Sequence, residues 1–171
     1  SLVRSEIVTT VEGEGSESNI KLVFGANERQ HIDIVANETH TGQNSRSNIL
    51  GRGVLSGRAH TVFRGNGTIK FGARNCATYQ KQQALLLSDK SRADSIPALI
   101  IDETEVSQAG HAATVGKLDE EQLFYLMARG LSREQATRLL VMAFLTPILP
   151  EIPVPELREE LTALMSAKVG G

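Results

Sequence analysis

Short stretches of alternating apolar and polar residues recur from the N-terminus to about Gly116. In a strand, such alternation places every second side chain on one face, which can then be buried. Clusters of Gly, Asn and Ser separate the stretches and are typical of turns. The pattern predicts many short strands with little helix between them. The clearest stretches are residues 6–11, 20–24, 31–35 and 96–101.

Two β architectures satisfy this pattern, an antiparallel sandwich and a β-solenoid. An Asn-Gly hairpin signal with alternating residues on both sides occurs once, at Asn66-Gly67. The other links between the predicted strands are irregular. These observations favour a parallel β-helix over residues 1–116.

After Gly116 the apolar period changes from two to about 3.6, which predicts a small helical domain over residues 117–171. Asp119 and Gln122 are spaced as the cap of a first helix, and Ser132 and Gln135 as the capping box of a second. Pro155 is suited to the first position of a third helix. The second helix is expected to bury Ala136, Leu139, Leu140, Ala143 and Phe144.

The composition is that of an ordinary globular protein, with 171 residues, 40% hydrophobic and 22% charged. No apolar run approaches the roughly 20 residues that span a bilayer, and the N-terminus lacks a signal-peptide pattern. We therefore expect a cytoplasmic protein without a membrane partner. The single cysteine, Cys76, excludes an internal disulfide and a Cys-rich zinc or iron–sulfur ligand set from this chain alone.

The net charge of −2 conceals a basic window between Glu38 and Asp89, which contains no acidic residue. Five of its cations are spaced by six and would share a face on one continuous strand. Together they define the basic strip. It would bind an anionic glycan or nucleic acid, because the guanidinium group of arginine forms bidentate hydrogen bonds with phosphate and similar anions. The alternative is a solvated outer face paired with acids elsewhere. The strip consists of Arg46, Arg52, Arg58, Arg64 and Lys70, and the basic window extends through Arg74 to Lys81.

Few other residues suggest chemistry. The window offers only three aromatic residues for stacking on bases, which argues against nucleic acid. Phosphate-loop and nucleophile-elbow motifs are absent. Asp102, Glu103 and Glu105 could resemble the carboxylates of a carbohydrate-cleaving β-helix, although adjacent acids in a turn are usually solvated. Of the four histidines, His111 has small neighbours that leave its ring accessible.

Residues 110–131, GHAATVGKLDEEQLFYLMARGL, closely resemble the region that marks the SufB/SufD family of iron–sulfur cluster assembly proteins. Residues 30–33, 52–65 and 83–89 look like further family segments, so the resemblance covers nearly the whole chain. It implies a right-handed parallel β-helix followed by a helical domain. It also implies a C-terminal portion of a longer protein, because full-length members carry more sequence before this point.

Two details resemble the SufD branch. Ala112 stands where SufB typically has Glu after the junction histidine, and residues 85–88 form a SufD-like run. The SufB cysteine implicated in cluster building would fall near Gln82, and Cys76 is out of register with it. A cysteine found in some SufD proteins is replaced by Ala109. This chain would therefore borrow its thiolates from a partner.

The resemblance implies a non-catalytic scaffold that pairs with a SufB-like subunit through its β-helix and with a SufC-like ATPase through its helices. His111 is then the candidate for cluster assembly at the interface, as an iron ligand or proton carrier. Phe124, Tyr125 and Arg129 match the family string and are candidates for binding the ATPase. We expect no cofactor bound by this chain alone, a nascent cluster shared with the partner, and a possible homodimer in isolation.

Overall fold

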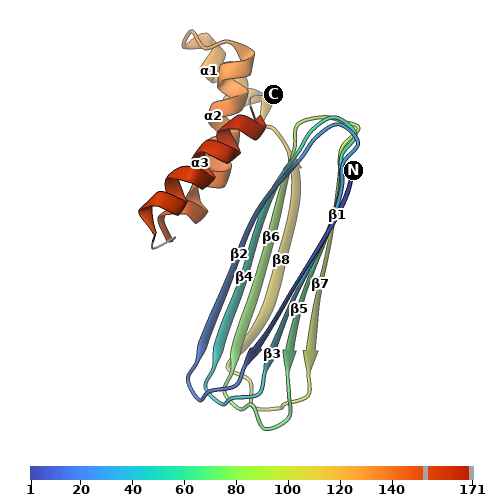
Figure 1. The fold of residues 1–171 in the computed structure, drawn as a ribbon, viewed down its shortest axis with the longest axis vertical. Coiled ribbons are helices and arrows are strands. Elements are labelled where there is room, and N and C mark those ends of the chain that lie inside the picture. The colour runs from blue at the N-terminus through green and yellow to red at the C-terminus, as the bar shows by residue number, and fades with distance from the viewer. Residues whose placement is uncertain (152–153, 170–171) are drawn as a thin grey trace.

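The computed structural model describes residues 1–151 and 154–169 (Figure 1). Eight strands of ten residues form the first part of the chain. They are β1 (Leu2–Val11), β2 (Glu17–Ala26), β3 (His31–His40), β4 (Arg46–Leu55), β5 (His60–Ile69), β6 (Ala77–Leu86), β7 (Arg92–Ile101) and β8 (Gln108–Lys117). The second part is helical, with α1 (Glu120–Ala128), α2 (Arg133–Leu145), the 3₁₀ helix η1 (Thr146–Glu151) and α3 (Pro155–Val169).

Successive strands alternate between two sheets, ordered β1-β3-β5-β7 and β2-β4-β6-β8. Every strand pair in these sheets is parallel. The chain therefore winds as a flattened β-helix of four coils, each made of one strand from either sheet (Figure 1). Leu2 pairs with His31 and His60 with Arg92, so one coil takes 29 to 32 residues. The predicted parallel β-helix is confirmed.

The hairpin signal at Asn66-Gly67 is wrong as a turn, because both residues lie inside β5. Gly67 faces the lumen, which is the interior between the two sheets, and a Cβ there would lie 2.8 Å from Nε2 of Gln80. Asn66 faces outward and donates from its amide to Oδ1 of Asn37 one coil earlier, at 2.7 Å. Gly67 therefore contributes to the packing of the lumen, and Asn66 contributes to a ladder of hydrogen-bonded asparagines.

Part of the lumen between the sheets is packed with apolar side chains. Phe24 and Phe63 meet edge to face with ring centroids 6.1 Å apart. Glycines make room for the rings, because a Cβ at Gly51 would lie 1.9 Å from Cε1 of Phe63 and one at Gly53 would lie 2.1 Å from Cε2 of Phe24. The glycine-rich β4 therefore forms a strand despite its low intrinsic propensity.

Another part of the lumen is polar. His40 is fully buried, with Nδ1 2.7 Å from the Ser45 hydroxyl and Nε2 2.8 Å from the Ser47 hydroxyl. Glu38 is also fully buried, and its Oε1 accepts a 2.6 Å hydrogen bond from Ser18. Burial raises the pKa of Glu38 and lowers that of His40.

The caps of the helices form as predicted. The Asp119 side chain accepts hydrogen bonds from the backbone of Glu121 and Gln122. Ser132 and Gln135 form a complete capping box at the start of α2. The third helix begins at Pro155.

The buried face of α2 differs from the prediction. Ala136 is buried as expected, but Val141 and Leu145 are buried as well, whereas Leu139 and Ala143 are exposed. The reason is that α2 docks on the outer face of the second sheet. One apolar cluster joins the helices to this sheet, and it is centred on Val54, Val141, Leu145 and Leu149, with Val23, Leu85, Leu87, Met142, Phe144 and Leu161 packed around it.

Candidate functional site at the open end of the β-helix

The fourth coil, β7 and β8, is the C-terminal edge of both sheets. In the part of the chain that the structure describes, each of these strands has a hydrogen-bonded neighbour on one side only. An unpaired parallel edge is a template for pairing with another chain. Lumen-facing residues at this end are correspondingly accessible, with Ile101 and Val115 each 44% exposed.

His111 lies on the lumen-facing row of β8. Its register partner in β6 is Gln80, which is fully buried in the lumen, and aligned residues of a parallel ladder point the same way. The His111 side chain is exposed because no further coil covers it. Ala109 and Ala113 flank it on the same row, so its ring nitrogens are sterically accessible.

Within residues 1–151 and 154–169, no group of three or more His, Cys, Asp or Glu side chains is placed to hold a metal ion. His111 is thus not part of such a group in the described residues.

Cys76 lies between β5 and β6, immediately before the start of β6, and packs with Ile69 and Ala73. Its side chain is fully buried, and its thiol donates to the Gly42 carbonyl at 3.1 Å. The Ser45 hydroxyl lies 3.1 Å from the sulfur. Cys76 thus acts as a buried packing residue.

Of the three candidate contact residues for an ATPase, Phe124 and Tyr125 lie on α1, and Arg129 is the C-cap residue of this helix. Phe124 is 74% exposed and Tyr125 58% exposed. Arg129 stacks on the Tyr125 ring at 5.0 Å and donates to its hydroxyl at 2.8 Å. Leu123 is the buried residue of this helix, so the candidate residues form an outward apolar surface with one ordered cation.

The structure does not bring the basic strip onto one face. A coil is much longer than the spacing of six, so the cations fall on different sheets and turns. Arg46 and Arg52 lie on β4, Arg64 on β5, and Arg58 and Lys70 in turns. Most of the strip is paired with acids, through Arg46–Glu17 at 3.6 Å, Lys70–Asp102 at 3.3 Å and the Arg64–Asp33 contact.

Arg52 has a structural role that its place in the strip did not indicate. Its guanidinium donates to the Phe144 carbonyl in the last turn of α2 and lies 5.4 Å from the centre of the Phe144 ring. Burial lowers the pKa of Arg52, and its Nε has no hydrogen-bond partner among the described residues. Arg52 thus attaches the helices to the β-helix.

The carboxylates at residues 102–105 hold a turn together. The Glu103 carboxylate accepts hydrogen bonds from the backbone of Gly72, Thr104 and Glu105, which lower its pKa. Asp102 pairs with Lys70. The lowered pKa of Glu103 is the opposite of what a general acid needs.

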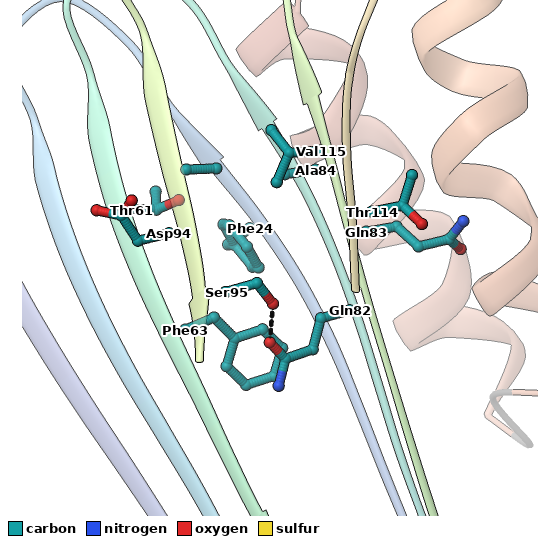
Figure 2. Close-up of a pocket in the computed structure, with 11 residues that line it drawn as sticks. Phe24, Thr61, Phe63, Gln82, Gln83, Ala84, Asp94, Ser95, Thr114 and Val115 are labelled. Atoms are coloured by element: carbon teal, nitrogen blue, oxygen red, sulfur yellow. Dashed lines mark hydrogen bonds between the residues drawn. The ribbon is translucent and has the colours of Figure 1, made fainter. Parts of the chain in front are cut away.

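A small cavity opens in the lumen near the fourth coil (Figure 2). Two of its polar groups engage each other, because the Ser95 hydroxyl of β7 hydrogen-bonds to the Gln82 amide. The rest of the wall combines apolar and polar residues, which are Phe24, Phe63, Ala84, Ala93 and Val115, and Thr61, Gln83, Asp94 and Thr114.

Comparison with known proteins agrees with this architecture. Residues 1–144 match the family model described as the SufBD core domain of the SUF system for FeS cluster assembly. The chain belongs to the SufBD family. The resemblance of residues 110–131 to this family is thereby confirmed.

The SufBD relatives include an iron–sulfur cluster assembly protein SufD from Bacillus subtilis, 38% identical over 165 residues. That alignment covers 96% of this chain and 38% of the relative. A SufBD family protein of Mycobacterium tuberculosis is 39% identical over 158 residues, covering 88% of this chain and 40% of the relative. The chain therefore spans about two fifths of the length of these relatives. No helix in its described part is long and apolar enough to cross a membrane.

Proposed function

We propose that this chain acts as a SufD-type scaffold in iron–sulfur cluster assembly. The observation that carries the proposal is the open fourth coil, where two unpaired strand edges surround the exposed His111. A SufB-like subunit with matching edges would extend both sheets and cover the lumen-facing residues of β7 and β8. Without that partner, the same edges would pair with a second copy.

His111 would act at this interface on iron delivered as a substrate. A neutral imidazole presents one lone pair, which can bind Fe²⁺ or take up a proton near neutral pH. Cys76 is completely buried, so the sulfur ligands would come from the partner. The chain itself would hold no resident cofactor and catalyse no reaction.

The helices would present α1 to a SufC-like ATPase. The exposed Phe124 and Tyr125 supply apolar contact area, and Arg129 is already ordered against the tyrosine ring. Movement of the ATPase would be transmitted to the β-helix through the apolar cluster beneath α2. ATP hydrolysis would belong to the partner.

Reconstitution tests this proposal. The chain is mixed with a SufB-like subunit and a SufC-like ATPase, and co-purification and cluster formation are measured. We expect a stable complex and at least about tenfold slower cluster formation with His111→Ala, as for loss of a positioned acid–base or ligand group. His31→Ala, a histidine on the outer face of β3, is the matched control and should retain the full rate. Failure to co-purify would refute the scaffold role. Full activity of His111→Ala would refute the role of His111 in cluster assembly.

A further inference from the structure

The two free edges of the fourth coil offer different backbone groups to another chain. In a parallel sheet, the N–H and C=O groups of one residue point to the same neighbouring strand, and those of the next residue point to the opposite side. Only alternate residues of an edge strand therefore present free groups. The bonds that each strand makes to its inner neighbour show which residues these are.

In β8 the odd-numbered residues face the open side. The backbone N–H of Gln108 donates to the Cys76 carbonyl, immediately before β6. Gln108 and the other even-numbered residues of β8 are thus bonded to β6. Along the open side, β8 presents an uninterrupted row of donors and acceptors, from Ala109, His111, Ala113, Val115 and Lys117.

The same alternation leaves a gap in β7. The backbone N–H of Arg92, at the start of β7, donates to the Ala59 carbonyl on the β5 side. The N–H of Asp102, just past the end of β7, donates to the Ile69 carbonyl of β5. Even-numbered residues therefore bond to β5, and the odd-numbered Pro97 faces the open side. Because proline has no N–H, the free edge of β7 lacks a donor near its middle.

A proline is tolerated at this position because no bond to β5 is lost. A strand that paired along all of β7 would leave its own carbonyl opposite Pro97 without a donor, and a buried carbonyl without a donor is unfavourable. Edge prolines are one means by which proteins prevent unwanted strand pairing. By contrast, β8 contains no proline, and four of its first six side chains are those of glycine or alanine, which permit close approach.

We propose that the open end has one principal docking edge, β8, and that Pro97 closes the β7 edge to a continuous ladder. The occupant is an extended strand of the SufB-like subunit, which adds to the sheet of β2, β4, β6 and β8. That identity rests on the proposed function, whereas the inequality of the two edges does not. Along β7 the partner pairs only in short segments on either side of Pro97, which open readily.

Two alanine-to-proline substitutions form a matched pair. Ala113→Pro removes a free N–H from the open edge of β8, and Ala93→Pro removes one from that of β7. Both residues are odd-numbered, so neither change breaks a bond to the inner neighbour. We expect Ala113→Pro to weaken binding of the SufB-like subunit about tenfold, and Ala93→Pro to change it less than about twofold. Equal effects of the two substitutions would overturn the assignment of β8 as the docking edge.

Backbone amide exchange of the wild-type chain tests the same assignment without a substitution. When the SufB-like subunit binds, the amides of His111, Ala113 and Val115 should exchange at least about tenfold more slowly. The amides of Ser95 and Leu99, on either side of Pro97, should slow by less than about threefold. Equal slowing along both strands would contradict the proposal.

Self-association separates this inference from the proposed function. Pro97→Ala restores the missing N–H, so sedimentation of the free chain should show self-association at least about tenfold stronger than in the wild type. Urea unfolding checks that the variant is folded. If the SufB-like subunit does not bind the wild type, the proposed function fails, and sedimentation alone decides the inference. Equal self-association of the wild type and Pro97→Ala would overturn it.

Discussion

Replacing Arg52 with Met tests whether this residue fastens the helices to the β-helix. The substitution keeps the apolar stem beside the cluster of Val54 and Leu145 and removes the guanidinium. It eliminates the hydrogen bond to the Phe144 carbonyl and the contact with the Phe144 ring. Because that carbonyl lies in the last turn of α2, it also loses a cation that complements the helix dipole.

The expected loss follows from opposing contributions. A hydrogen bond from a charged donor is worth about 1.5–3 kcal/mol, and a cation–π contact about 0.5–2 kcal/mol. The buried Nε without a partner costs about 1–3 kcal/mol, which the substitution relieves. We therefore expect Arg52→Met to lower the free energy of unfolding by about 1–2 kcal/mol.

Urea unfolding measures this loss, and hydrogen exchange locates it. Exchange should accelerate in α2 and leave the strands of the lumen protected. Arg46→Met, on the same strand but in an exposed ion pair, is the control and should change stability by less than about 0.5 kcal/mol. If Arg52→Met matched that control, the guanidinium would not be what holds the helices.

Two further predictions concern the lumen. Gly53→Ala should destabilise the chain by about 1–3 kcal/mol in urea unfolding, because its Cβ would lie 2.1 Å from the Phe24 ring; unchanged stability would show that the ring moves freely. Glu38→Gln should abolish a pH dependence of thermal stability. Burial raises the native pKa of Glu38 above its ordinary 4.5, so its contribution is complete below that value and is lost as pH rises through the native pKa. The variant should therefore be more stable than the wild type above the native pKa, and parallel stability curves would contradict this.

The sequence was most informative where structure is local. The caps at Asp119 and Ser132 were predictable because each involves a side chain and a backbone N–H within three residues. The apolar alternation of β3 predicted a strand because this pattern is also local in the sequence. By contrast, β4 and β6 place Gly, Ser, Thr and Gln on the lumen side, and only the other coils show why those positions are buried.

The basic strip illustrates the limit of spacing arguments. An interval of six places residues on one face only while the strand continues, and a strand here is ten residues long within a coil of 29 to 32. Arg52 and Arg64 consequently lie on different sheets. His111 was identifiable through its motif. Its alignment with Gln80 on the neighbouring strand was not, because that alignment depends on a strand register across 31 residues.

The placement of the helices bears directly on the proposed function. Solenoids normally carry a polar cap over each end, because an open coil exposes its inner row. Here the helices dock beside the β2–β4–β6–β8 sheet and leave the fourth coil open (Figure 1). Ala109 and Ala113 limit the apolar area exposed next to His111, whereas Ile101 and Val115 expose apolar area farther along the open coil, which a covering chain would bury. The helices pack on a lateral face of the β-helix and leave its end uncovered. This arrangement suits completion of the β-helix by another chain.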